Sequence, residues 1–179
     1  TGLGGDLFAL VSPDPEAEVV ALNASGRAPA GLSAHALRAA GHTAMPVASP
    51  EAVTIPGAVD GICGLSERFG RLGLDAVLEP AIRYAEEGVP VAPRVAFDWA
   101  RATDRLQGPA RKLFLMGGAS PATGQVFRAP GQAEVLRRIA RDGRSAFYEG
   151  EVADDMLSAL DGGPHNAADF AENRPDWGA

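Results

Sequence analysis

Two short apolar runs near the start of the chain have the composition of β-strands. Residues 7–11 read Leu-Phe-Ala-Leu-Val, and residues 18–23 contain two valines among other aliphatic side chains. Residues 12–17 between them carry two prolines, which are tolerated in a turn because no ladder hydrogen bond is needed there. The pattern therefore predicts a β-hairpin.

The rest of the chain follows a helical spacing of apolar positions. Ser33 is a suitable N-cap for a helix over residues 34–40, and Gly41 is a suitable stop. A proline-rich link over residues 45–56 leads to a second helix, in which Val59, Ile62, Cys63 and Phe69 recur near helical spacing. Further helices are predicted over residues 75–87, 93–106, 132–142, 145–160 and 166–171.

The helix predicted to start near Asp75 and to stop at Gly88 contains a proline. Pro80 fits if it lies in the first turn, where a helix has no use for the missing N–H. We expect this helix to bury its apolar stripe, which consists of Val77, Leu78, Ile82 and Ala85.

Two strands followed by a series of helices is an α+β order and not a βαβ alternation. The 179 residues, at 18.4 kDa, have the size of one ordinary domain. The chain starts without a methionine and enters its first strand almost at once, and it stops without a polar tail. We therefore expect residues 1–179 to be a single partial domain of a longer protein.

Composition and charge exclude several classes of protein. Hydrophobic residues make up 46% and charged residues 22% of the chain, which is typical of a globular protein and excludes a disordered tail. The net charge of −7, without a basic block, argues against a nucleic-acid partner. The apolar stretches are too short to cross a bilayer, so no membrane partner is expected.

Metal binding is not expected. Cys63 is the one cysteine, so neither a disulfide within the chain nor a cysteine zinc cluster can form, and its place on an apolar stripe favours a buried thiol. His35 and His42 have no acidic residue at helical spacing, and His165 is distant in sequence. We interpret the histidines as surface or capping residues and expect no cofactor.

Nucleophile and phosphate motifs are also missing. The chain has no Gly-x-Ser-x-Gly elbow, and its Gly-rich start precedes a strand where a dinucleotide loop follows one. The stronger candidate is Arg27, which comes where the second strand ends before Pro29. A guanidinium there can clamp a carboxylate, although a surface ion pair is the more common role of such an arginine.

Several segments, in collinear order, together resemble the γ-glutamyltranspeptidases, also called γ-glutamyltransferases or glutathione hydrolases, and in particular their acylase-like relatives. The segments are Gly-Leu-Gly-Gly-Asp-Leu-Phe-Ala-Leu at 2–10, Leu-Asn-Ala-Ser-Gly-Arg-Ala-Pro-Ala at 22–30, Thr-Ile-Pro-Gly-Ala-Val-Asp-Gly at 54–61, Arg-Phe-Gly-Arg-Leu at 68–72, Leu-Glu-Pro-Ala-Ile-Arg-Tyr-Ala-Glu-Glu-Gly-Val-Pro-Val at 78–91, and Gly-Gly-Pro-His at 162–165 with Asp-Phe-Ala at 169–171.

The resemblance implies an N-terminal-nucleophile hydrolase with an αββα sandwich, made as a precursor that cleaves itself into a large and a small subunit. In that family the new N-terminal threonine of the small subunit is the nucleophile, and its α-amino group is the general base. An α-amine suits this role because its pKa of about 7.7–8.0 lies near working pH. The chain corresponds to the middle of the large subunit, so no catalytic residue is expected in it. Its expected partners are the rest of the large subunit, the small subunit and a small amide substrate.

One departure from the family bears on substrate recognition. Glutathione-cleaving members carry an arginine that holds the substrate α-carboxylate, and the matching position here is Ser25, followed by Gly26, with an arginine at Arg27. In extended backbone Ser25 and Arg27 would face the same side, roughly 6–7 Å apart. We expect both to line the substrate site, with Arg27 meeting an acyl carboxylate from a shifted position.

Three functions stay open on this basis. The first is a γ-glutamyltranspeptidase-like enzyme that hydrolyses or transfers a γ-glutamyl or similar acyl group. The second is a glutaryl or cephalosporin acylase, which the serine at Ser25 favours. The third is a non-catalytic scaffold module. Because the hairpin would lack its sheet neighbours, we also expect the isolated chain to aggregate.

Overall fold

The computed structural model describes residues 2–178, which divide into two compact units. Within this range, the first unit consists of residues 2–74 and 138–178, and the second of residues 75–137. The elements follow an α+β order, as the sequence predicts. Within the described residues, no helix is both long and apolar enough to traverse a lipid bilayer. The assignment of the whole chain to one partial domain stays a prediction.

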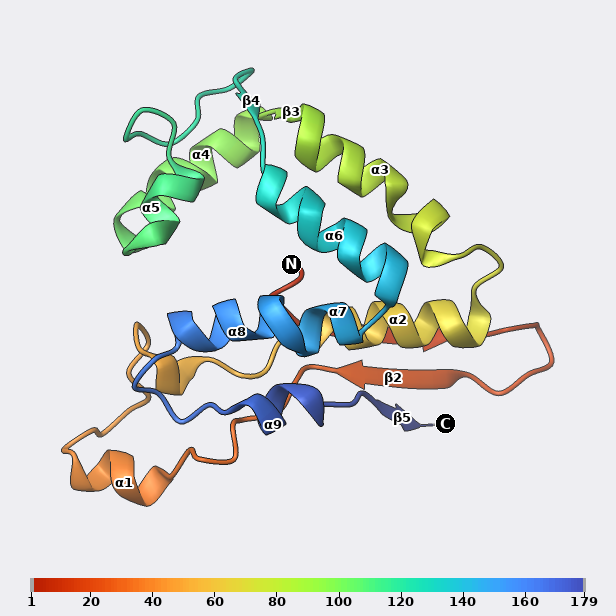
Figure 1. Ribbon diagram of the computed structural model, residues 1–179, viewed down its shortest axis with the longest axis horizontal. Helices are drawn as coiled ribbons and strands as arrows, with labels where there is room; N and C mark the ends of the chain where they lie inside the picture. Colours follow the sequence, from red (N-terminus) through yellow and green to blue (C-terminus); the bar gives the residue numbers. More distant parts are fainter. Residues whose placement is uncertain (1, 179) are drawn as a thin grey trace. The chain divides into compact units, whose positions relative to one another are not determined.

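A three-stranded antiparallel sheet is the centre of the first unit (Figure 1). The predicted hairpin is confirmed: β1 (Leu7–Val11) pairs with β2 (Val20–Ala24), with Leu7 opposite Ala24. Strand β5 (Asp176–Gly178), which the sequence did not predict, pairs with the other edge of β2 so that Trp177 lies opposite Leu22. The central strand β2 therefore joins distant parts of the chain.

Helix α2 (Ala58–Phe69) packs closely on one face of this sheet. The approach depends on Gly61, because a Cβ atom there would lie 2.9 Å from the side chains of both Leu7 and Ala24. Leu7 therefore points toward α2, and the alternation of a strand turns Phe8 and Leu10 to the opposite face. That face is open in the described structure, with Phe8 68% and Leu10 78% exposed.

The remaining helices of the first unit are short. They are α1 (Ala34–Ala39), a 3₁₀ helix (Pro50–Ala52), α7 (Ser145–Tyr148), α8 (Gly150–Ala159) and α9 (Ala167–Ala171). The predicted caps are confirmed: Ser33 accepts a hydrogen bond from the Ala36 N–H, and Asn166 caps α9. The single helix predicted over residues 145–160 is wrong, because extended backbone at Glu149 and a positive φ at Gly150 divide it into α7 and α8.

The second unit contains most of α3 (Leu74–Glu87), α4 (Pro93–Ala102) with a 3₁₀ turn (Thr103–Arg105), α5 (Pro109–Phe114) and the start of α6 (Pro130–Asp142). Neither α5 nor the two-stranded pairing of β3 (Val89–Pro90) with β4 (Val126–Phe127) was predicted from the sequence. Trp99, Phe114 and Phe127 form an aromatic cluster, in which Trp99 and Phe127 lie 4.8 Å apart, edge to face.

Two expectations for α3 are wrong. Pro80 lies beyond the first turn, where it withholds a hydrogen bond from the Ala76 carbonyl. Of the expected buried stripe only Leu78 is buried, whereas Val77 is 49% exposed and Ile82 and Ala85 are half-buried. The spacing of apolar residues identifies the apolar face of a helix, but it does not show which other elements cover that face.

Candidate functional site

The segment that carries Ser25 and Arg27 leaves the sheet immediately after β2. Strand β2 ends at Ala24, and the backbone N–H of Ser25 donates to Oδ1 of Asn23 at 3.1 Å. Gly26 then takes a φ of +76°, which is far from extended backbone. The extended geometry assumed for Ser25 and Arg27 is therefore wrong, and their alternation no longer argues that they share a face.

Arg27 is held at its backbone and at its side chain. Its carbonyl accepts a hydrogen bond from the Ile55 N–H at 2.9 Å. Its Nη2 donates to Oδ1 of Asp176 on β5 at 2.9 Å, and the two side chains are 68% and 66% exposed. The surface ion pair considered from the sequence is thus present, and its exposure leaves the guanidinium open to other partners.

Arg27 borders a groove of about 390 Å³, which we call the Arg27 groove. Other residues that line it are Ile55, Asp169, Glu172, Asn173 and Arg174. Ser25 is not among the lining residues, so the structure does not bring both predicted binding residues to this groove. The groove presents two guanidinium groups, a set suited to binding an anion.

The acidic side chain Asp169 in the groove is already used by the fold. Its two oxygens accept hydrogen bonds from the backbone N–H groups of Ala30 and Asn166, both at 2.9 Å. The second bond completes a capping box with Asn166 at the start of α9, and the first ties the segment after Arg27 to that helix. Asp169 therefore shapes the groove and is not a free acceptor in it.

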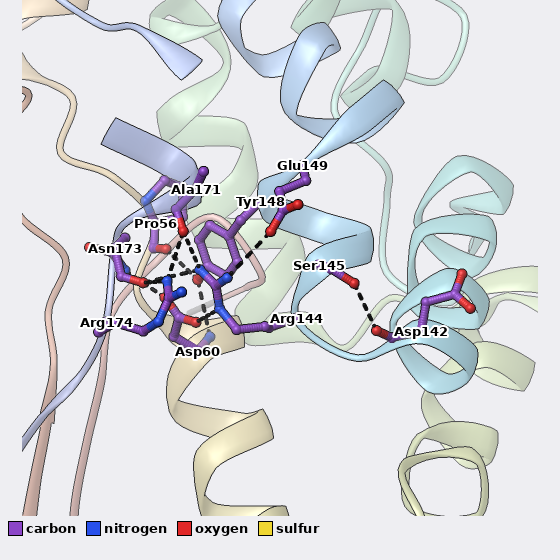
Figure 2. A network of polar contacts seen from close by, with 10 residues as sticks. All are labelled: Pro56, Asp60, Asp142, Arg144, Ser145, Tyr148, Glu149, Ala171, Asn173 and Arg174. Atoms are coloured by element: carbon purple, nitrogen blue, oxygen red, sulfur yellow. Dashed lines mark hydrogen bonds and ion pairs between the residues drawn. The ribbon is translucent and has the colours of Figure 1, made fainter. Parts of the chain in front are cut away.

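A buried ion pair lies next to the groove (Figure 2). The side chain of Asp60 on α2 is 1% exposed, and its Oδ1 accepts from Arg144 Nε at 2.6 Å. Its Oδ2 accepts from the side-chain amide of Asn173 at 2.7 Å, while Arg144 Nη2 donates to the Asn173 carbonyl at 3.0 Å. Two donors thus satisfy the buried carboxylate, as a buried charge requires.

Tyr148 extends this network to the segment beside Arg27. Its hydroxyl donates to the Pro56 carbonyl at 2.6 Å and accepts from the Asp60 N–H at 3.0 Å. Burial, followed by the negative charge of Asp60, raises the pKa of the Tyr148 hydroxyl, so it remains a donor at physiological pH. Because Ile55 precedes Pro56 and bonds to Arg27, the network fixes the backbone on which Arg27 lies.

Cys63 lines a second cavity of about 720 Å³ in the first unit, which Asp60 and Arg144 also line. The thiol expected to be buried is only partly buried. Burial, followed by the charge of Asp60, raises the pKa of the Cys63 thiol to about 11. A thiol of this kind is a poor nucleophile at neutral pH.

The histidines do not form a cluster. His165 lies with Nε2 2.9 Å from the Val53 carbonyl, a contact that fastens the proline-rich link, while His35 and His42 are exposed. Among residues 2–178, no group of three or more His, Cys, Asp or Glu side chains is arranged to hold a metal ion.

Most polar residues of the Arg27 groove and of the buried network around Asp60 were not predicted from the sequence. Asp60 carried a usable signal, because it is an acidic residue between apolar neighbours at the start of a helix, where burial demands a partner. Its partners Arg144 and Asn173 are 84 and 113 residues away in sequence, and no sequence pattern connects them with Asp60. Asp176 and Arg174 were missed for the same reason.

Comparison with known proteins gives consistent matches. The family model described as gamma-glutamyltranspeptidase matches residues 1–179. The glutathione hydrolase-like YwrD proenzyme of Bacillus subtilis (strain 168) is 35% identical over 188 residues, which cover 100% of this chain and 35% of the relative. The chain thus spans about a third of that relative's length.

Solved structures agree with this. The cephalosporin acylase from Bacillus halodurans matches with a TM-score of 0.93 at 39% identity, over 99% of this chain and 35% of that one. The gamma-glutamyltranspeptidase of Helicobacter pylori matches with a TM-score of 0.85 at 25% identity, over 98% of this chain and 52% of that one. The predicted fold, part of an N-terminal-nucleophile hydrolase sandwich, is confirmed.

Proposed function

The chain belongs to the γ-glutamyltranspeptidase family, and from this premise we propose that it forms part of the large subunit of a self-cleaving amidase. In the parent enzyme, the N-terminal threonine of the small subunit attacks the amide carbonyl and forms an acyl-enzyme, which water or an amine acceptor resolves. This chain supplies scaffold and part of the pocket for the acyl group. We expect the nucleophile outside this chain, and among residues 2–178 no group of three or more His, Cys, Asp or Glu side chains is arranged to hold a metal ion.

We propose that Arg27 recognises a carboxylate on the acyl group. The observation that carries this role is the exposed Arg27 guanidinium at the border of the groove. A guanidinium pairs with a carboxylate through charge-assisted hydrogen bonds worth about 1.5–3 kcal/mol. The pairing with Asp176 is a surface ion pair of only about 0–1 kcal/mol, so a substrate carboxylate can replace or share it.

The acyl group is γ-glutamyl or a close analogue, and Ser25 favours an analogue without the α-amino acid end. Glutathione-cleaving members hold the α-carboxylate through an arginine at this position, and a serine cannot supply that fork. The acylase named above, at 39% identity, supports the same direction. Glutaryl amides are therefore the preferred candidates, with γ-glutamyl amides as the alternative. Whether the acyl group passes to water or to an amine is a property of the parent's acceptor site.

We further propose that the open face of the β1–β2–β5 sheet receives the second sheet of the sandwich, carried by the rest of the parent. Phe8 and Leu10 line a cavity of about 540 Å³ on this sheet, whereas the Trp177 ring packs against Phe69 of α2. An exposed apolar patch of this kind marks a contact surface. The partners are then the remaining large subunit and the small subunit that carries the nucleophile.

Kinetics of the full-length processed protein test this function. Rates on γ-glutamyl, glutaryl and pentanoyl anilides are compared for the wild type and for Arg27→Ala, with Arg71→Ala as a surface control. We expect Arg27→Ala to raise KM for the two carboxylated donors by about tenfold or more, the effect of one charge-assisted pair. Equal effects on all three donors would remove Arg27 from the acyl pocket. If the parent protein is instead a non-catalytic scaffold, it should cleave none of the three anilides. It should also not cleave itself to expose a threonine as a new N-terminus.

A further inference from the structure

Arg174 lines the Arg27 groove, and it also lines the neighbouring cavity that contains Cys63. Its Nη1 donates to the carbonyls of Ala171 at 2.7 Å and of Asn173 at 2.6 Å. Both bonds use the same nitrogen, so they anchor the guanidinium through Nη1. Nε and Nη2 form no hydrogen bond with residues 2–178. Arg174 also has no acidic partner within that described range, in contrast to Arg27.

The Arg27 groove holds charges of both signs, and they differ in how they are engaged. Asp176 neutralises Arg27, so this pair alone offers little net attraction to an anion. Asp169 is bonded to two backbone N–H groups, and Glu172 is exposed to solvent, where its charge is screened. Arg174 is thus a cation of the groove that has no acidic partner among residues 2–178.

Asn173, beside the groove, has one side-chain oxygen without a hydrogen-bond partner among the described residues. Its residue is 5% exposed and lines the groove, and its side-chain Nδ2 is fixed by the bond to Asp60. Its Oδ1 is buried without a hydrogen-bond partner. A buried acceptor left without a partner costs about 1–3 kcal/mol, which a bound water relieves and which a carboxylate, having no N–H or O–H, does not.

We infer that Arg174 is a further specificity-determining residue, whose free N–H groups bind the acyl-donor carboxylate together with Arg27. This inference rests on the proposed function, since it assigns the same ligand to the same groove. It adds a residue that is anchored before the ligand arrives. An anchored guanidinium loses little side-chain entropy on binding, and the gain in affinity is correspondingly larger.

Chemical protection in the wild-type, full-length protein tests this without a substitution. Phenylglyoxal modifies accessible guanidinium groups, and peptide mass spectrometry reports the rate separately for Arg27, Arg174 and the surface control Arg71. We expect glutarate to slow the modification of Arg27 and Arg174 but not of Arg71, and pentanamide to slow none of them. If Arg27 alone is protected, the role of Arg174 is overturned while the proposed function stands.

Two further outcomes separate the inference from the proposed function. Protection of both arginines in a protein that cleaves no anilide supports the Arg174 site and overturns the proposed function. Protection of neither arginine overturns the Arg174 site, and it overturns carboxylate recognition by Arg27 as well.

Two variants add a measurement of affinity. Arg174→Gln keeps a donor for the carbonyls but removes the charge, whereas Arg174→Lys keeps the charge. We expect Arg174→Gln to weaken glutarate binding about tenfold, as the loss of one charge-assisted bond predicts, and Arg174→Lys to weaken it less. Unchanged glutarate affinity in Arg174→Gln overturns the inference. If Arg174→Gln does not fold, the protection experiment decides alone.

Discussion

Arg27 Nη2 donates to Asp176 Oδ1 at 2.9 Å, although 149 residues separate the two in sequence. The pairing of β2 with β5 brings them together, because it lays the last strand beside the strand that leads to Arg27. The proposed acyl-binding arginine is therefore already engaged by an internal carboxylate. Any substrate carboxylate has to compete with Asp176 or share the guanidinium with it.

The substitution Asp176→Asn removes this competitor. An exposed pair is worth about 0.2–1 kcal/mol, so we expect KM for a glutaryl anilide to fall by up to about fivefold in the full-length enzyme. KM for the neutral pentanoyl anilide should stay unchanged, as should both values in the surface control Asp161→Asn. A rise in KM for the glutaryl donor alone would mean that Asp176 positions Arg27 and does not compete for it.

The substitution Arg144→Met leaves the buried Asp60 carboxylate with Asn173 as its only remaining side-chain donor. Breaking one partner of a buried ion pair costs about 3–5 kcal/mol, and we expect the free energy of unfolding of the full-length protein to fall by that amount. Urea unfolding measures it. The double variant Asp60→Leu with Arg144→Met should recover much of the loss, because it leaves no buried charge.

The matched control for that prediction is the exposed pair of Arg94 and Asp98, whose side chains are 82% and 52% exposed. Arg94→Met removes one partner of a helical surface pair, and such a pair contributes about 0.3–0.5 kcal/mol. If Arg94→Met and Arg144→Met lowered the free energy of unfolding equally, burial of Asp60 would not be the reason why losing its partner is costly.

The Cys63 thiol should react slowly with iodoacetamide. Its pKa of about 11, against an ordinary 9.0, lowers the thiolate fraction at pH 8 by roughly 100-fold. We expect the alkylation rate, followed by mass spectrometry of the peptide containing Cys63, to rise steeply up to about pH 11. Because the folded-state pKa is the higher one, stability from this group is complete below pH 9 and is lost as the pH rises toward 11. A rate that levels off near pH 9 would contradict this assignment.

The substitution Gly26→Ala should destabilise the protein strongly. The residue has a φ of +76°, and a Cβ atom would lie 1.7 Å from the Ile55 carbonyl oxygen. Strain and steric overlap together are expected to cost more than about 3 kcal/mol, seen as a large fall in soluble yield and melting temperature. Gly41→Ala is the control, since Gly41 has a φ of +88° with nothing within 4 Å. Its cost should be only about 1–2 kcal/mol.

Features that depend on neighbouring residues were predictable from the sequence. The hairpin followed from two apolar runs and a proline-rich turn, and Ser33 and Asn166 cap their helices as predicted because a cap involves only the next few residues. The break at Gly150 was missed because a glycine after a periodic run is compatible with both a helix interior and a stop.

Features that depend on distant residues were not predictable. Strand β5 is three residues long and pairs through the fold, so nothing in its own composition marks it as a strand. The partners of Asp60 and Arg27 likewise come from the last third of the chain. Arg27 was identified through its chemistry and the family resemblance, but the sharp turn at Gly26 altered the direction that extended backbone assigned to it.

The place of β2 between β1 and β5 has a consequence for protein synthesis. The ribosome delivers β1 and β2 before β5, and roughly 150 residues follow Arg27 before Asp176 emerges. Throughout that interval the edge of β2 that pairs with β5 is uncovered, and the Arg27–Asp176 pair cannot form. A nonsense mutation upstream of residue 176 would therefore leave an unpaired, aggregation-prone strand edge for chaperones or proteases to bind.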